Sequence, residues 1–128
     1  MEVQQDFRAV AQDLEQVGLV WRPSLGDEVS FREQPDRITV IVDPSAFPEY
    51  EFRERYLWLP KTEQLMAQLE ARQAVLFHAG LELNENRFCY RAVVQVKSIS
   101  IEAEAPSLRL VLGMSLRDIL VFSKTPIQ

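Results

Sequence analysis

The apolar residues near the N-terminus recur with the period of an α-helix, and this is the strongest folding signal in the chain. They stand at successive steps of four, three, four and three: Val3, Phe7, Val10, Leu14 and Val17. On a helix these residues form one apolar stripe, and Gly18 then provides a left-handed residue that can end it. The pattern predicts an amphipathic helix that packs on a sheet. A short coiled-coil dimer is the alternative, although two heptads are few for one.

Extended segments follow this helix. LVWRP at 19–23 precedes a turn, EVSFRE at 28–33 alternates apolar and polar residues, and RITVIVD at 37–43 is rich in β-branched residues. Gln34-Pro35-Asp36 has the composition of a turn. Together these segments predict an antiparallel meander.

The stretch EYEFRERYLWL at 49–59 interleaves aromatic and charged residues, and its alternation from 50 to 53 predicts a further strand or an extended edge segment. Aromatic and arginine side chains are enriched in binding hot spots. The candidate binding residues are therefore Tyr50, Phe52, Arg53, Tyr56 and Trp58. The competing interpretation is a loop whose aromatic side chains close an open end of the core.

The letters LPKTE at 59–63 differ by one residue from the LPxTG cell-wall sorting signal. Glu63 replaces the required glycine, and an amphipathic run follows in mid-chain, so the sorting interpretation fails. Pro60 suits the first position of a helix, and Leu65, Met66 and Leu69 have helical spacing. The segment predicts a short helix over residues 60–71.

The next segments, 74–83 and 88–105, read as strands joined by a polar turn at 84–87. Alternation places Val75, Phe77, Ala79, Leu81 and Leu83 on one face of the first strand. If Leu83 pairs with Phe88, then Cys89 lies opposite Glu82 and His78 lies opposite Val93. The apolar residues change from even to odd numbers near Lys97 and Ser98, which indicates a turn or a bulge there. A turn is preferred because one strand of that length would be unusual.

The last segment, 107–122, has helical period and is apolar on nearly every side. Such a helix is either buried on several sides or part of a subunit interface, for which the candidates are Leu110, Met114 and Val121. Gly113 keeps open an alternative, a strand at 107–112 before a shorter helix.

These elements predict an α+β fold in a single domain over residues 1–128. It has an N-terminal amphipathic helix, an antiparallel sheet of about five to six strands, a short middle helix and a C-terminal apolar helix. Apolar residues make up 47% of the sequence, which suits a folded chain.

Charge and composition narrow the function. A net charge of −5 argues against general nucleic-acid binding. No apolar run reaches the roughly 18 residues of a membrane helix. The N-terminus lacks the pattern of a secretory signal, and a lone cysteine suits a reducing interior, so we expect a cytoplasmic protein.

The sequence predicts no catalytic residue, metal site or cofactor. His78 is the only histidine, which excludes two-histidine metal sites within one chain. In the expected register Cys89 lies about 13 Å from the position that faces His78, too far for a catalytic pair. Phosphate-binding glycine motifs do not occur. Glu102 and Glu104 share a strand face and could hold a cation, but a solvated strand face explains them better.

Two functions from different classes remain. The first is a non-catalytic interaction or accessory module, a homo-oligomer that also binds an unknown protein partner through the aromatic segment and the last helix. The second is an enzyme or ligand-binding protein with a pocket between sheet and helices, lined by Glu51, Arg53, Tyr56 and His78.

Overall fold

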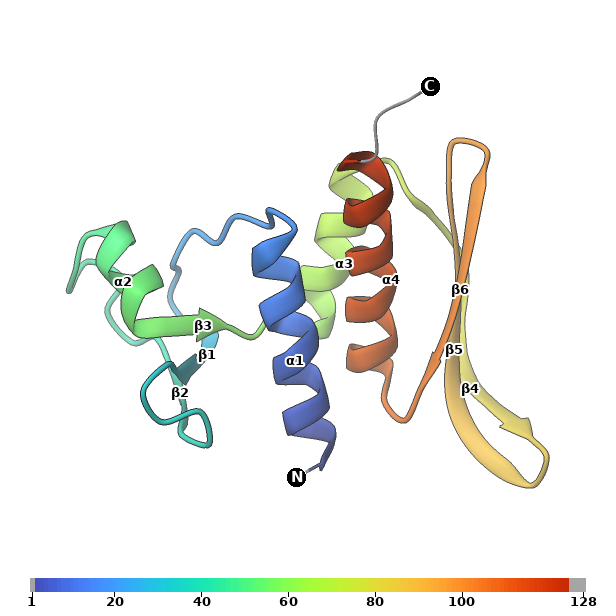
Figure 1. The fold of residues 1–128 in the computed structure, drawn as a ribbon, viewed down its shortest axis with the longest axis horizontal. Helices are drawn as coiled ribbons and strands as arrows, with labels where there is room; N and C mark the ends of the chain where they lie inside the picture. The colour runs from blue at the N-terminus through green and yellow to red at the C-terminus, as the bar shows by residue number, and fades with distance from the viewer. Residues whose placement is uncertain (1, 125–128) are drawn as a thin grey trace.

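A computed structural model describes residues 2–124, and side chains from residue 7 to residue 123 (Figure 1). The helices are α1 (Glu2–Gln16), α2 (Glu49–Arg55), α3 (Thr62–Ala71) and α4 (Leu108–Lys124). The strands are β1 (Glu28–Phe31), β2 (Ile38–Val40), β3 (Tyr56–Trp58), β4 (Val75–Asn84), β5 (Arg87–Val96) and β6 (Ile99–Ala105). The chain therefore has the predicted α+β class.

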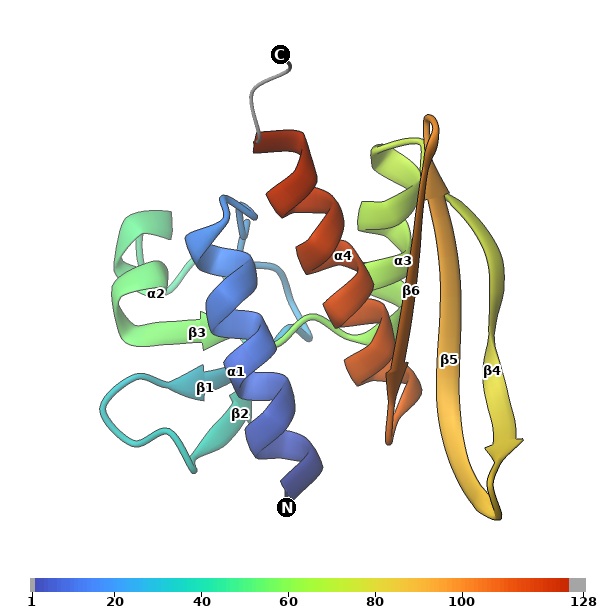
Figure 2. The ribbon, with the colours of Figure 1, turned by 45° about the vertical axis from the view of Figure 1, so that its right-hand side comes forward.

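The strands form two antiparallel sheets of three strands each, with orders β2-β1-β3 and β4-β5-β6. The prediction of a single sheet of five to six strands is wrong. Strand β3 returns to pair with β1, and the chain then enters α3 before it reaches β4. Helices α1, α4 and α3 consequently lie between the two sheets (Figures 1 and 2).

Helix α1 confirms the N-terminal prediction. Phe7, Val10 and Leu14 are buried and pack with α4, while Val3 lies outside the described side chains. Gly18 has a φ of 104°, and the amide of Leu19 donates to the carbonyl of Leu14 at 2.9 Å. This is the left-handed ending that the glycine predicted. The described part of the apolar stripe is covered within the chain.

Helix α4 confirms the helical interpretation of the last segment. It contacts α1, α3, β5 and β6, so its apolar residues are buried on several sides. A Cβ atom on Gly113 would lie 3.0 Å from Cε1 of Phe7 and 3.1 Å from Cγ1 of Val10. The glycine therefore allows α1 and α4 to approach closely, and it does not interrupt the helix.

The segment at 49–55 is the helix α2, and the extended structure predicted for residues 50–53 is wrong. Glu49 pairs with Arg53 and Glu51 pairs with Arg55, both at the i,i+4 spacing that places side chains side by side on a helix. Residues 19–23 also differ from expectation, since they belong to no strand.

Helix α3 begins at Thr62 with Lys61 as its N-cap, so Pro60 precedes the helix and does not occupy its first turn. The amide of Lys61 donates to Oε1 of Gln64 at 2.9 Å. The length of the middle helix otherwise follows the prediction.

In the second sheet the predicted hairpin register is confirmed: Leu83 pairs with Phe88, Glu82 with Cys89 and His78 with Val93. The turn between Val96 and Ile99 is also confirmed. The predicted alternation in β4 is wrong, because a bulge between Leu76 and His78 inserts one residue. Leu76 therefore packs on the same core as Ala79, and Val75 and Phe77 are exposed.

Candidate functional site

The two tryptophans of the chain meet beside the first sheet. Trp21 follows α1 in residues 19–27, which form neither helix nor strand and are called the irregular segment, and Trp58 ends β3. Their rings stack with centroids 6.3 Å apart and planes 11° apart, and Phe52 of α2 contacts Trp21 edge-on. Trp21 and Phe52 are buried with Val29 and Ile41 in a second, smaller core. This aromatic stack joins α2 and the first sheet to the irregular segment.

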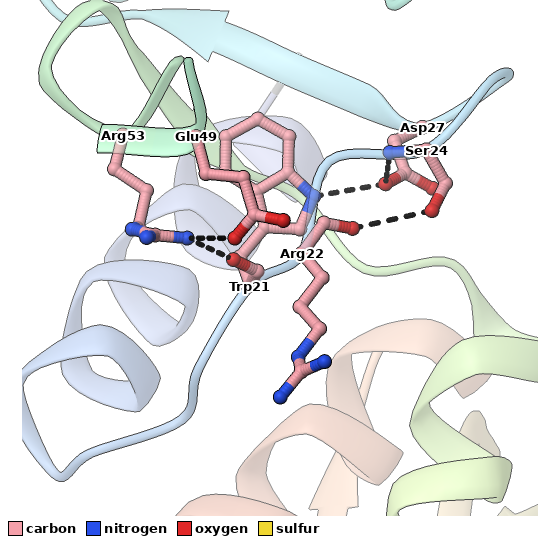
Figure 3. A network of polar contacts seen from close by, with 6 residues as sticks. All are labelled: Trp21, Arg22, Ser24, Asp27, Glu49 and Arg53. Carbon is pink, nitrogen blue, oxygen red and sulfur yellow. Dashed lines mark hydrogen bonds and ion pairs between the residues drawn. The ribbon is translucent and has the colours of Figure 1, made fainter. Parts of the chain in front are cut away.

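Asp27 holds Trp21 of the stack in place from one side (Figure 3). Its buried carboxylate accepts hydrogen bonds from Nε1 of Trp21 at 2.8 Å, the amide of Ser24 at 3.0 Å and Nε2 of Gln64 at 2.7 Å. A buried carboxylate needs such donors, because its desolvation is otherwise costly. Asp27 thus links the irregular segment to the start of α3.

Arg53 closes the other side of the stack (Figure 3). Its Nη1 atom donates to the carbonyl of Trp21 at 2.7 Å and lies 3.4 Å from Oε1 of Glu49. The guanidinium group therefore fastens α2 onto the segment that carries Trp21.

A hollow lies beside the stack, between α1 and the first sheet. Its lining includes Leu19, Val20, Trp21, Arg53 and Trp58, and its volume is about 310 Å³, near the lower end for small-ligand pockets. Nε1 of Trp58 is shielded from solvent and has no hydrogen-bond partner among the described residues. Because this atom is shielded, the hollow offers a ligand the apolar side chains of its lining and not this donor.

The predicted binding residues do not share one surface. Phe52 is buried, Tyr56 is half-buried and packs on Phe31 and Phe52, and Tyr50 is exposed. Arg53 and Trp58 belong to the stack described above. Residues 50–58 therefore contribute to the smaller core as well as to the surface.

The four residues that were expected to line one pocket do not all come together: Glu51 and Tyr56 line one hollow, Arg53 lines the hollow beside the tryptophans, and His78 lines neither. Glu51, Arg53 and Tyr56 lie in α2 and β3, whereas His78 lies in β4 of the other sheet. The helical layer stands between those sheets (Figure 1). The proposed pocket of these four side chains does not form.

The three interface candidates on α4 differ in their exposure to solvent. Leu110 is buried in the main core, so its side chain offers no surface, and Met114 is half-buried against that core. Val121 is exposed next to Phe122 near the end of the helix.

Large apolar side chains are exposed at the tip of the β4–β5 hairpin. Leu81, Leu83 and Phe88 are 56%, 61% and 70% exposed, and we call these three side chains the hairpin patch. These three side chains lie on the same face of the sheet as Ala79 and Ala92, which pack toward the helices. The hairpin runs past the start of α4, so the apolar face continues where no helix covers it (Figure 2).

The opposite face of this hairpin is polar. Nε2 of His78 lies 2.7 Å from Oε2 of Glu82, a contact without hydrogen-bond geometry, and Arg91 pairs with Glu82 and Glu102. The hydrogen bond from Arg91 to Glu102 raises the pKa of the guanidinium group. Cys89 faces Glu82 and not His78. Arg91 and the two glutamates therefore pair with one another on an outer sheet face.

Within residues 2–124, no three histidine, cysteine or acidic side chains are placed to hold a metal ion together. No helix in the same range combines the length and apolar character that crossing a membrane requires.

The sequence did not reveal Trp21 and Asp27 as partners, because they stand six positions apart in irregular backbone. It also assigned Leu81 and Leu83 to the same face as Phe77, since the bulge leaves no mark in the order of apolar residues. The one available signal for the patch was the polar composition of the alternate positions His78, Gly80 and Glu82.

No protein-family model matches this chain, and neither the curated proteins nor the solved structures include one that is significantly similar to it.

Proposed function

We propose that the protein is a non-catalytic interaction module that binds a protein partner through the hairpin patch. The observation that carries this proposal is the exposure of Leu81, Leu83 and Phe88 on the core-facing side of the second sheet. The same face forms the main core only a few residues away, through Ala79, Ala92 and Val94.

The energetics favour burial of this patch. Full burial of a leucine or phenylalanine side chain is worth about 1.5–3 kcal/mol. Contiguous apolar side chains on a surface commonly mark binding sites, and polar side chains on the opposite face keep the hairpin solvated there. A partner that covered the patch would complete the apolar layer that α4 covers over the rest of the sheet.

The test is affinity purification of the tagged chain from its native cell, with quantitative mass spectrometry and a second, differently tagged copy present. The double variant L83S/F88S removes most of the patch, and L25S is the matched control because Leu25 is 72% exposed in a distant loop. We expect L83S/F88S to lose its specific partner and L25S to retain it. Recovery of the same proteins by all three chains would refute the proposal.

A second candidate function rests on the hollow beside the tryptophans. We propose as the alternative that it binds a small, largely apolar molecule, which packs on the apolar side chains that line it. Both tryptophans of the chain lie in this stack, so tryptophan emission reports on this site alone.

The probes are small aromatic carboxylic acids and their methyl esters, added to the wild-type chain and to W58F. A saturable change in emission whose dissociation constant W58F raises severalfold would support the site, because Trp58 lines the hollow and phenylalanine buries less apolar surface there. Unchanged emission across the series would remove this candidate.

A further inference from the structure

Strand β4 is an open edge of the second sheet. Among residues 2–124 its only strand neighbour is β5, and no other labelled element lies beyond it in Figure 2. An edge strand presents unpaired amide and carbonyl groups that can pair with another chain.

The hairpin turn shows which groups these are. Glu85 and Asn86 form a two-residue turn with φ of 51° and 66°, closed by the pair Asn84 and Arg87. In such a hairpin the closing pair is hydrogen-bonded, and bonded pairs then alternate along the strands. By this alternation Ala79, Leu81 and Leu83 direct their amides and carbonyls away from β5.

This stretch lacks the usual protection of an edge. Natural edges carry lysine, proline or a bulge, yet residues 79–84 contain neither lysine nor proline, and the bulge lies before them. The one charge in the stretch, Glu82, is engaged on the outer face by His78 and Arg91.

The hairpin is also locally neutral in an acidic chain. The net charge is −5, but within residues 75–96 the charges of Glu82 and Glu85 balance those of Arg87 and Arg91. Two hairpins can therefore approach each other without the repulsion that the rest of the surface would impose.

We propose that the partner of the hairpin patch is a second copy of this chain, paired antiparallel along β4 with the twofold axis at Leu81. This inference rests on the proposed interaction function and names its partner. Leu81 then faces Leu81 of the second copy, and Ala79 faces Leu83 of that copy.

This register uses the whole straight stretch between the bulge and the turn. All three outward-facing residues of each copy find partners, which gives about six backbone hydrogen bonds. On the outer face Glu82 comes opposite Gly80 of the second copy, which has no side chain to obstruct it. A strand that pairs with itself is self-complementary, as a twofold interface requires.

The same arrangement explains the exposed patch. A twofold axis between antiparallel strands is perpendicular to the sheet, so the helices of both copies lie on the same side of the combined sheet. Leu81 then contacts its equivalent, and Leu83 comes opposite Ala79 of the second copy, which packs toward the helices of that copy. Leu81 and Leu83, which no helix covers in one chain, are thereby covered in two.

The test is disulfide cross-linking of the full chain in a C89S background, which removes the native thiol. In a hydrogen-bonded antiparallel pair the Cα atoms lie about 5.5 Å apart, within the range of a disulfide. We expect L81C to form a cross-linked dimer rapidly on mild oxidation. L83C is the control, because two copies of that position lie about 13 Å apart in this register.

Light scattering provides the second readout. Wild type should have twice the 14.8 kDa mass of one chain. L81K should raise the dissociation constant at least about tenfold, because it sets like charges directly opposite each other, while L25K should not. Circular dichroism on each variant shows whether the fold is intact.

A wild-type monomer at several hundred micromolar, a dimer that L81K leaves intact, or cross-linking of L83C in place of L81C would each overturn this inference. The interaction function would survive that result if L83S/F88S still lost a partner other than this chain. Failure of both experiments would remove both proposals.

Discussion

Nε1 of Trp21 donates a 2.8 Å hydrogen bond to Oδ2 of Asp27, and both side chains are buried. Residues 19–27 belong to no strand, and this bond helps to hold them against the first sheet. Ser24 and Gln64 are further donors, so the carboxylate holds the irregular segment and helix α3 together.

Replacement of this carboxylate should destabilise the protein. D27N turns an acceptor into a donor that faces Trp21 and Ser24 or Gln64, and we expect a loss of about 2 kcal/mol in the free energy of unfolding. Urea denaturation followed by tryptophan fluorescence measures it. D36N, at an exposed aspartate, is the control; equal stability of the two variants would contradict this role of Asp27.

Arg109 should matter for a related reason. Its guanidinium group donates to the carbonyls of Pro60 at 2.8 Å and Leu59 at 2.5 Å, pairs with Glu28 at 2.7 Å and lies over Phe7. We expect R109A to lose about 2–4 kcal/mol of stability.

R109K should recover only part of that loss, because one ammonium group cannot reproduce the planar fork. Thermal and urea unfolding provide the measurement. R22A, at an exposed arginine, should stay within about 0.5 kcal/mol of wild type. Full stability of R109K would show that charge alone is sufficient.

Gly113 should tolerate only a small side chain. G113A gains about 1 kcal/mol of helix propensity and meets Phe7 and Val10 at 3.0 and 3.1 Å, so we expect a net change within about 1 kcal/mol. G113V must separate α1 from α4 and should lose about 2–3 kcal/mol. Calorimetry compares the two, and a G113V variant as stable as G113A would disprove the close approach.

Much of the fold could be predicted from periodicity, because α1, α4 and the β4–β5 hairpin are long enough to repeat their pattern several times. Helix α2 was too short for that. The sequence signal for α2 was the i,i+4 spacing of Glu49 with Arg53 and of Glu51 with Arg55, which pair in the structure. The alternation of Tyr50 and Phe52 favoured a strand instead.

The candidate sites were harder to predict. The bulge before His78 shifts the faces of β4 without changing its composition, so the patch was not visible as a surface. Trp58 was recognised as a candidate, but Trp21 stacks on it and Asp27 bonds to Trp21 through contacts that no local spacing encodes.

One carboxyl group provides a test with pH. The hydroxyl and the amide of Ser45 donate to Oδ1 of Asp43 and hold the pKa of that carboxyl below its ordinary value. A lowered pKa in the folded state means that the turn is stabilised above the unfolded pKa and loses this as pH falls through the folded one.

We expect S45A to raise the pKa of Asp43 toward its ordinary value, with the largest part of the change below about pH 4. Carboxyl-carbon NMR titration measures this pKa directly, with S24A as the control. An unchanged pKa in S45A would show that the hydroxyl does not contribute.

The most direct test of the account is amide hydrogen exchange of the wild-type chain over a range of concentrations. The amides of Leu81 and Leu83 face the open edge, while that of Glu82 is paired with β5 in a single chain. We expect exchange at Leu81 and Leu83 to slow as concentration rises, and exchange at Glu82 to change much less. Fast exchange at Leu81 and Leu83 at every concentration would contradict pairing of β4 with a second copy.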